Sequence, residues 1–183
     1  MKQIAILFSG SGTNFDYIAK ELHNKKLQIA VALTNNPDAK GIDVAKKHNI
    51  KTVIIDSSNK ERKEFDKLVV ETLSKYKLDL VVLAGFMRIL TPIFTQNIKA
   101  INLHPSLLPR HKGLHAIERS FEDSFSEGGV SVHYVTSKLD DGEIIVQKSI
   151  DKSALDFNEY YNKIRTIEKI ALKEAILKVL EIK

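Results

Sequence analysis

The chain has 183 residues, of which 43% are hydrophobic and 28% are charged, a balance typical of a soluble globular protein and not of a disordered one. The formal net charge is +5, but Lys and Arg are scattered along the chain, so no basic surface for nucleic acid is predicted. The chain has no cysteine, which excludes disulfides, thiolate metal sites and cysteine nucleophiles.

The length favours one domain, residues 1–183, with a sizeable core. The apolar run near the start, residues 4–8, is shorter than the core of a secretory signal, and the longest uncharged apolar run, residues 80–87, is too short to span a bilayer. We therefore expect a cytoplasmic protein.

The first hundred residues alternate between short apolar runs and amphipathic stripes. The runs predict strands, the stripes predict helices, and the continuous apolar character of the strands favours a parallel sheet covered on both faces. Strands are expected at 4–8, 27–33, 52–55, 80–84 and 100–104, with helices around 15–22, 41–48 and 60–76 between them.

The second half is less regular. A proline-flanked loop at 105–112 is followed by an expected helix at 115–125, strands at 130–135 and 144–150, and a long closing helix at 158–181. The pattern predicts an α/β protein: a single domain with a mostly parallel twisted sheet flanked by helices, Rossmann-like in class.

Asn102 and His104 lie at the end of the fifth expected strand. Because they are two residues apart on a strand, their side chains point to the same face of the sheet. Pro105 ends the strand, because proline has no N–H to donate to a neighbouring strand. The carboxyl ends of such strands form ligand crevices, which points to a site. The alternative is a strand end whose histidine ring only caps a turn.

A glycine-rich loop, Ser-Gly-Ser-Gly-Thr-Asn at 9–14, follows the first strand and precedes a helix. Exposed N–H groups and the helix dipole favour an anion there, and a monophosphate fits best. The loop is not a Walker A motif, and Phe15 occupies the place of the third glycine of the dinucleotide fingerprint. The alternative is a turn that needs glycine only for packing.

Two further features could carry chemistry. Asp140, in Leu-Asp-Asp-Gly, is a carboxylate that could reach His104 if the fold returns that loop to the sheet, although acidic turns are common. The apolar segment 83–90 contains a single Arg and could form the wall of a pocket for a flat heterocycle, or simply core with one surface Arg.

Five segments, in this order, resemble the phosphoribosylglycinamide formyltransferase family of folate-dependent formyltransferases. They are Ser-Gly-Ser-Gly-Thr-Asn at 9–14, Leu-Ala-Gly-Phe-Met-Arg-Ile-Leu at 83–90, Asn-Leu-His-Pro-Ser-Leu-Leu-Pro at 102–109, Gly-Leu-His at 113–115 and Ser-Val-His at 131–133. The core around His104 is shared with methionyl-tRNA formyltransferase and formyltetrahydrofolate deformylase. Another formyltetrahydrofolate-dependent formyltransferase or deformylase is therefore the alternative.

The resemblance implies transfer of a formyl group from 10-formyltetrahydrofolate, a co-substrate, to the amine of glycinamide ribonucleotide in purine synthesis. It implies that Asn102, His104 and Asp140 are catalytic. Gly12, Thr13, Asn14 and Glu168 would bind the phosphoribosyl group. The folate would contact Arg62, Met87, Arg88, Ile89, Leu90 and Asn102.

Amine attack on a formyl carbon creates an oxyanion, which Asn102 and a protonated His104 could stabilise. Asp140 beside His104 would favour the imidazolium and could order a relay water. No metal is required. Asp141 stands where the family pattern leads us to expect Gly, so either neighbouring carboxylate could take the role, and we favour Asp140.

We expect small-molecule partners, no nucleic acid, no membrane, and a monomer or homodimer. Two other classes of function stay open at this point. A nucleotide-binding regulatory module would use the glycine loop, and a nucleic-acid binder would use a basic face, but neither would need Asn102 and His104.

Overall fold

The computed structural model describes residues 1–183. Seven strands form one sheet with the order β3-β2-β1-β4-β5-β6-β7. The strands are β1 (Gln3–Phe8), β2 (Gln28–Thr34), β3 (Thr52–Ile54), β4 (Leu80–Leu83), β5 (Ala100–His104), β6 (Glu127–Tyr134) and β7 (Ile144–Asp151). The helices are α1 (Thr13–Leu22), α2 (Gly41–Lys47), α3 (Arg62–Leu73), α4 (Pro92–Thr95), α5 (Ala116–Glu122) and α6 (Phe157–Val179).

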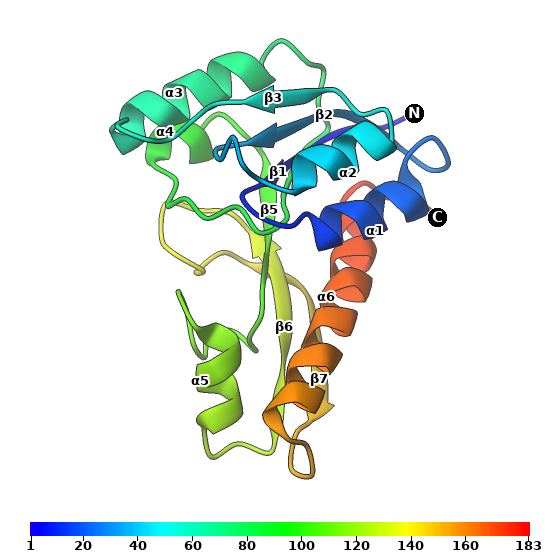
Figure 1. Cartoon of the computed structure of the whole chain (residues 1–183), viewed down its shortest axis with the longest axis vertical. Coiled ribbons are helices and arrows are strands. Elements are labelled where there is room, and N and C mark those ends of the chain that lie inside the picture. Colours follow the sequence, from blue (N-terminus) through cyan, green and yellow to red (C-terminus); the bar gives the residue numbers. More distant parts are fainter. The chain divides into compact units, whose positions relative to one another are not determined.

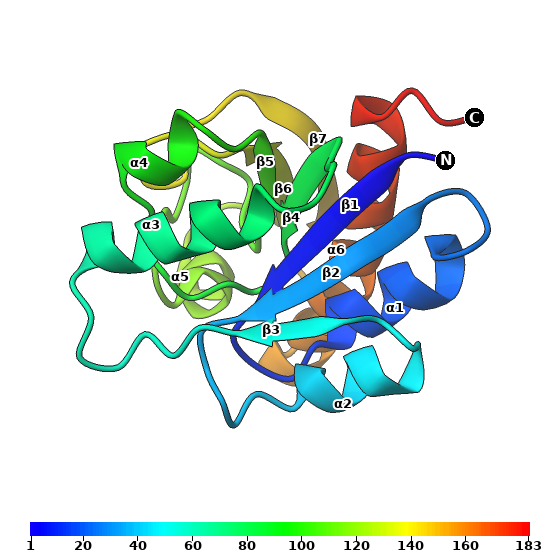
Figure 2. The same ribbon diagram turned by 90° about the horizontal axis from the view of Figure 1, so that it is seen from above.

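The chain forms two compact units, the first of which contains residues 1–101 and 182. Its strands pair in parallel, β1 with both β2 and β4, and β2 with β3. Helices α1 and α2 lie on one face of these strands and α3 lies on the other (Figures 1 and 2). Every residue of β1 from Ile4 to Phe8 is fully buried, as expected for a central strand covered on both sides.

The second unit contains residues 102–181 and 183. Strands β6 and β7 form an antiparallel pair, and α6 packs against both of them (Figure 1). A capping box begins α6: the Asp156 side chain accepts from the Glu159 N–H, and the Glu159 side chain accepts from the Asp156 N–H. Its buried face includes Ile164, Leu172 and Ile176.

The predicted α/β fold with a mostly parallel sheet flanked by helices is confirmed, and each expected strand is present. The helix expected at 115–125 is shorter, since α5 ends at Glu122, and the short helix α4 had no signal in the apolar pattern. No helix is both long and apolar enough to cross a membrane. Whether the two units act as one domain stays a prediction.

His23, after α1, is a buried histidine without a place in the proposed chemistry. Its Nδ1 accepts a hydrogen bond from the Ile29 N–H at 3.0 Å, so protonation of Nδ1 would break that bond. Burial lowers the pKa of His23 below its ordinary 6.5, and the charge of His48 acts in the same direction. The unfolded chain thus binds protons more readily than the folded one, and stability is lost as the pH falls below about 6.5.

We therefore expect His23→Asn, whose amide oxygen can accept the same bond without titrating, to flatten the loss of stability between about pH 7 and pH 5. Denaturant unfolding across this range measures the effect. The exposed His115 provides the control, because His115→Asn should keep the wild-type slope. Parallel curves for the wild type and His23→Asn would show that His23 does not contribute to this loss of stability.

Candidate active site

Asn102, His104 and Asp140 come together in the second unit. His104 is the last residue of β5 and is only 6% exposed, and Asp140, in the loop between β6 and β7, is 8% exposed. Asp140 Oδ2 lies 3.4 Å from His104 Nδ1, and Asp140 Oδ1 lies 3.5 Å from Asn102 Nδ2. The return of this loop to the end of β5, which the sequence left open, is thus present in the structure.

The surroundings of His104 determine which ring nitrogen carries hydrogen. Nε2 lies 2.8 Å from the backbone oxygen of His111, and because a carbonyl can only accept, Nε2 must be the donor. In the neutral ring Nδ1 is then the basic nitrogen, and it faces Asp140. Nδ1 is therefore the atom that can take up and release a proton.

The pKa of His104 corrects one expectation. Burial lowers it below the ordinary 6.5, and this outweighs the carbonyl of His111 and the charge of Asp140, which both act to raise it. The imidazole is therefore neutral near pH 7 and not held protonated by Asp140. The 3.4 Å separation from Asp140 is consistent with this, since charged hydrogen bonds are about 2.7–2.9 Å long.

Asp140 itself is ionised. Burial alone would raise its pKa, but His133, the charge of His104 and the Gly113 N–H together hold the pKa below the ordinary 3.8. Gly113 donates its N–H to Asp140 Oδ2 at 2.9 Å. The carboxylate is thus fixed in position by a backbone group before any substrate is bound.

His133, on β6, is a member of this cluster that sequence reasoning did not place among the catalytic residues. Its Nδ1 lies 2.8 Å from the carbonyl of Tyr134 and so carries hydrogen, and in the neutral ring Nε2 accepts from the Asn102 amide at 3.3 Å. In the charged ring Nε2 also carries hydrogen and faces Asp140 Oδ1 at 3.5 Å, the contact through which His133 lowers the pKa of Asp140. Ser131 and His133 stand two residues apart on one strand and are both buried. The signal available in the sequence was the family-like segment Ser-Val-His at 131–133, in which two polar residues are spaced two apart within an apolar strand.

Asp141 turns out of the cluster. It is exposed and forms an ion pair with Lys112, whose charge and hydrogen bond lower the pKa of Asp141. The structure therefore places only Asp140 beside His104. The second carboxylate is neutralised outside the cluster.

The glycine loop 9–14 lies in the first unit at the carboxyl end of β1. Gly12 precedes α1 with φ of 73°, and a Cβ there would lie 2.7 Å from the Cα of Gly41. Glycine is therefore required for conformation and for close packing, so part of the packing alternative holds. Gly12 also has no side chain to cap α1, which keeps the helix N-terminus suited to an anion.

The loop is tied to neighbouring strand ends. Ser9 Oγ donates to Asn35 Oδ1 at 2.5 Å and accepts from the Met87 N–H at 2.7 Å. The Asn36 amide donates to the Ser9 carbonyl at 3.2 Å. The segments after β1, β2 and β4 are thus connected within the first unit.

The segment after β4 carries the residues expected to contact folate. Met87 and Ile89 are 64% and 45% exposed, whereas the side chain of Leu90 is buried. The Arg88 guanidinium lies 4.8 Å from the centre of the Phe65 ring, and its buried Nη2 has no hydrogen-bond partner. Arg62 is exposed at the start of α3. Exposed apolar side chains beside an Arg suit a flat polar heterocycle.

Glu168, the fourth residue expected at the phosphoribosyl group, lies on α6 in the second unit. It is 2% exposed, and its Oε2 lies 2.6 Å from Arg165 Nη1. A buried carboxylate paired with a partly exposed Arg stays charged and can accept hydrogen bonds, as contact with a ribose would require.

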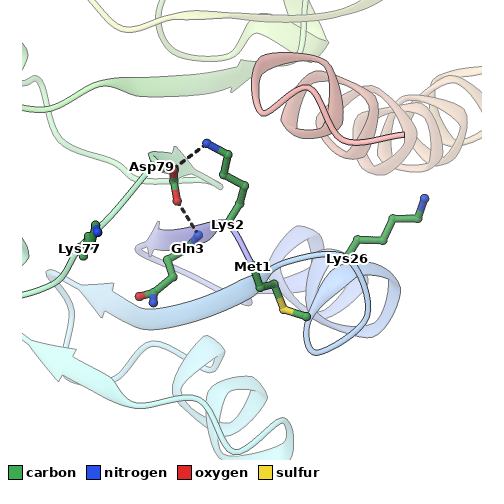
Figure 3. Close-up of a pocket in the computed structure, with 6 residues that line it drawn as sticks. All are labelled: Met1, Lys2, Gln3, Lys26, Lys77 and Asp79. Atoms are coloured by element: carbon green, nitrogen blue, oxygen red, sulfur yellow. Dashed lines mark hydrogen bonds and ion pairs between the residues drawn. The ribbon is translucent and has the colours of Figure 1, made fainter.

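A cleft of about 570 Å³ lies elsewhere in the first unit (Figure 3). It is at the amino ends of β1 and β4, where Asp79 accepts from Lys2 Nζ at 2.9 Å and from the Gln3 N–H at 2.8 Å. The glycine loop is at the carboxyl end of β1. The cleft contains no expected catalytic or binding residue, and its lining is Met1, Lys2, Gln3, Lys26, Lys77 and Asp79.

No group of three or more His, Asp or Glu side chains is arranged to hold a metal ion. Residues 2–176 match the model of the formyl transferase family, and the chain belongs to that family.

Individual relatives of this chain carry the name of one particular enzyme of the family. The chain is 39% identical over 155 residues to a phosphoribosylglycinamide formyltransferase of Haemophilus influenzae, covering 82% of this chain and 73% of that protein. It is 37% identical over 158 residues to the Escherichia coli protein of the same name, covering 84% and 74%. The crystal structure of the Campylobacter jejuni phosphoribosylglycinamide formyltransferase is 46% identical and superposes with a TM-score of 0.95, covering 98% of this chain and 97% of that one.

Proposed function

We propose that the protein transfers the formyl group of 10-formyltetrahydrofolate to the amine of glycinamide ribonucleotide, a step of purine biosynthesis. The observation that carries this is the cluster of Asn102 with the buried His104 and Asp140 in a chain of this family. The names of the relatives supply the substrate class.

The reaction needs a group that both accepts and returns a proton. The substrate ammonium must lose one proton before its nitrogen attacks the formyl carbon and a second after the new C–N bond has formed. The folate nitrogen must gain one proton before its own bond to the formyl carbon breaks, and the other proton is released to water. His104 Nδ1 can do both, because it is basic in the neutral ring and Nε2 is held by a carbonyl. Asp140 stabilises the imidazolium that forms between the two transfers.

The attack also places negative charge on the formyl oxygen. Asn102 is the proposed donor to this oxyanion. Its two contacts, 3.3 Å to His133 and 3.5 Å to Asp140, are at the long end of the hydrogen-bond range, so an amide hydrogen can be redirected to a stronger acceptor. His133 would keep the amide nitrogen turned toward the cluster.

The remaining roles concern binding. The uncapped start of α1, with Gly12, Thr13 and Asn14, is proposed to bind the phosphate, and Glu168 the ribose. Met87 and Ile89 are proposed to contact the folate heterocycle, with Arg62 toward its acidic tail. For Leu90 only the backbone remains for this role, because its side chain is buried.

The test is an assay with both substrates and purified protein, with no added metal and with a chelator in a parallel sample. We expect formylated ribonucleotide and tetrahydrofolate in equal amounts. Release of free formate, or formylation of methionyl-tRNA in place of the ribonucleotide, would transfer the assignment to another formyltetrahydrofolate enzyme.

The phosphate site has its own prediction. Thr13→Ala and Asn14→Ala should each weaken binding of glycinamide ribonucleotide while leaving binding of a folate analogue nearly unchanged, because both residues begin α1. Calorimetric titration of each ligand measures this. Equal losses for the two ligands would mean that the loop is only structural.

A cytoplasmic location, a monomeric or homodimeric state and the lack of nucleic-acid and membrane partners stay predictions.

A further inference from the structure

We propose that His111 is a positioning residue for this reaction: its backbone carbonyl fixes the tautomer of His104, and its imidazole, bound to Asp123, holds that carbonyl in place. The inference rests on the proton-transfer role proposed for His104. It assigns a task to a residue that is neither in the catalytic cluster nor in a binding loop.

The anchor of His111 is a network of charged groups. Its Nε2 lies 2.5 Å from Asp123 Oδ2, and Asp123 Oδ1 accepts from Lys152 Nζ at 2.7 Å. Lys152 is only 6% exposed. Lys152 is itself held in place, because it also donates to the carbonyls of Ser120, Phe121 and Asp123. The Asp123 carboxylate that binds His111 is therefore fixed on both sides.

The backbone of His111 is in the left-handed region, with φ of 54°, which a residue other than glycine adopts at a cost. That conformation directs one end of the residue, the carbonyl, to His104 and the other, the imidazole, to Asp123. The contact with Asp123 offsets the cost of the backbone conformation.

The same loop also orients Asp140. Gly113 donates its N–H to Asp140, and the Arg119 guanidinium on α5 donates to the carbonyls of Lys112 at 2.5 Å and Leu114 at 2.8 Å. Residues 111–114 thus present one acceptor to His104 and one donor to Asp140, while α5 and the segment after it hold them from outside.

Loss of the anchor has a specific chemical consequence. Without a fixed acceptor for Nε2–H, the neutral ring can carry its hydrogen on Nδ1, where it would bond to Asp140. That tautomer has no basic nitrogen on the side of Asp140 and cannot begin the proposed proton transfer. A fall in kcat, with little change in KM, follows.

Two amide substitutions that differ by one methylene group test this. His111→Asn tolerates the left-handed backbone but is too short to reach Asp123, whereas the His111→Gln amide can take the place of Nε2. The matched control is His48→Asn in the first unit, where His48 Nε2 lies 2.7 Å from Asp16 Oδ1. The readouts are the ¹⁵N shifts of the His104 ring in histidine-labelled protein and the steady-state kinetics.

We expect Nε2–H in the wild type, a shift toward the Nδ1–H form in His111→Asn, and a kcat lower by roughly 10- to 100-fold. His111→Gln should recover most of both properties, and His48→Asn should change neither. Unchanged His104 shifts in His111→Asn would overturn the proposal, even if kcat falls, because the role would then be structural only. A wild type with the Nε2–H tautomer that is lost in His111→Asn, but with no formyl transfer, would support the positioning and overturn the proposed function.

Discussion

Asp140→Asn is expected to lower the turnover of formyl transfer by at least ~100-fold, the lower end of the range for general acid–base groups. The substitution removes the charge that stabilises the His104 imidazolium. It keeps an oxygen to accept the Gly113 N–H, and Asn tolerates the left-handed φ of 48° at this position, so the loop should retain its fold. Substrate affinity should change much less, because the lost interaction is strongest in the transition state.

Asp141→Asn is the matched control, one residue along the same loop. Its carboxylate is exposed and forms an ion pair with Lys112, so its loss should leave kcat within about twofold of the wild type. Steady-state kinetics of both variants separate the two carboxylates. A crippled Asp141→Asn would mean that the wrong aspartate has been assigned, and two active variants would exclude a carboxylate from the mechanism.

The pH dependence of kcat/KM provides a second test of Asp140→Asn. Asp140 raises the pKa of His104 against the larger effect of burial, so its neutralisation should lower that pKa further. If neutral His104 is the base, the acid limb of the kcat/KM profile should therefore move to lower pH in Asp140→Asn. A shift to higher pH would show that another group governs that limb.

Local patterns were sufficient to predict the convergence of Asn102 and His104. Residues two apart on a strand share a face, and Pro105 ends the strand where such sheets bind ligands. The sheet itself was predictable because its strands are continuous apolar runs. The position of Asp140 was not, because the sequence shows an acidic turn but not where that turn packs.

The protonation state of His104 and the environment of Lys152 could not be predicted from the sequence, because both depend on burial. A neighbouring carboxylate suggested a protonated His104, but the cost of charging a buried ring is larger, and only the structure reveals that burial. Lys152 is a second residue whose burial could not be predicted from the sequence. In the sequence it follows a strand in Asp-Lys-Ser, a pattern typical of an exposed turn, yet its ammonium is enclosed by carbonyls and a carboxylate.

Lys152→Met is expected to lower the free energy of unfolding by about 3 kcal/mol or more, the usual cost of removing one partner from a buried ion pair. Three carbonyls at the end of α5 would lose their donor, and Asp123 would lose its closest cation. For a chain of this length, such a loss corresponds to a melting temperature lower by roughly 6–12 °C.

Lys148→Met is the control, because Lys148 pairs with Glu174 at 2.6 Å on an exposed surface, where ion pairs contribute about 0–1 kcal/mol. Acid adds a discriminating test. Burial acts to raise the pKa of Asp123, but Lys152 and His111 hold it at about 2, so the stabilisation from this carboxylate is present above 3.8 and is lost as the pH falls toward 2. The stability gap between the wild type and Lys152→Met should therefore narrow in that interval, because Asp123 becomes neutral in both proteins. A gap that is already below 1 kcal/mol at neutral pH would show that the network around Lys152 contributes no more than a surface ion pair.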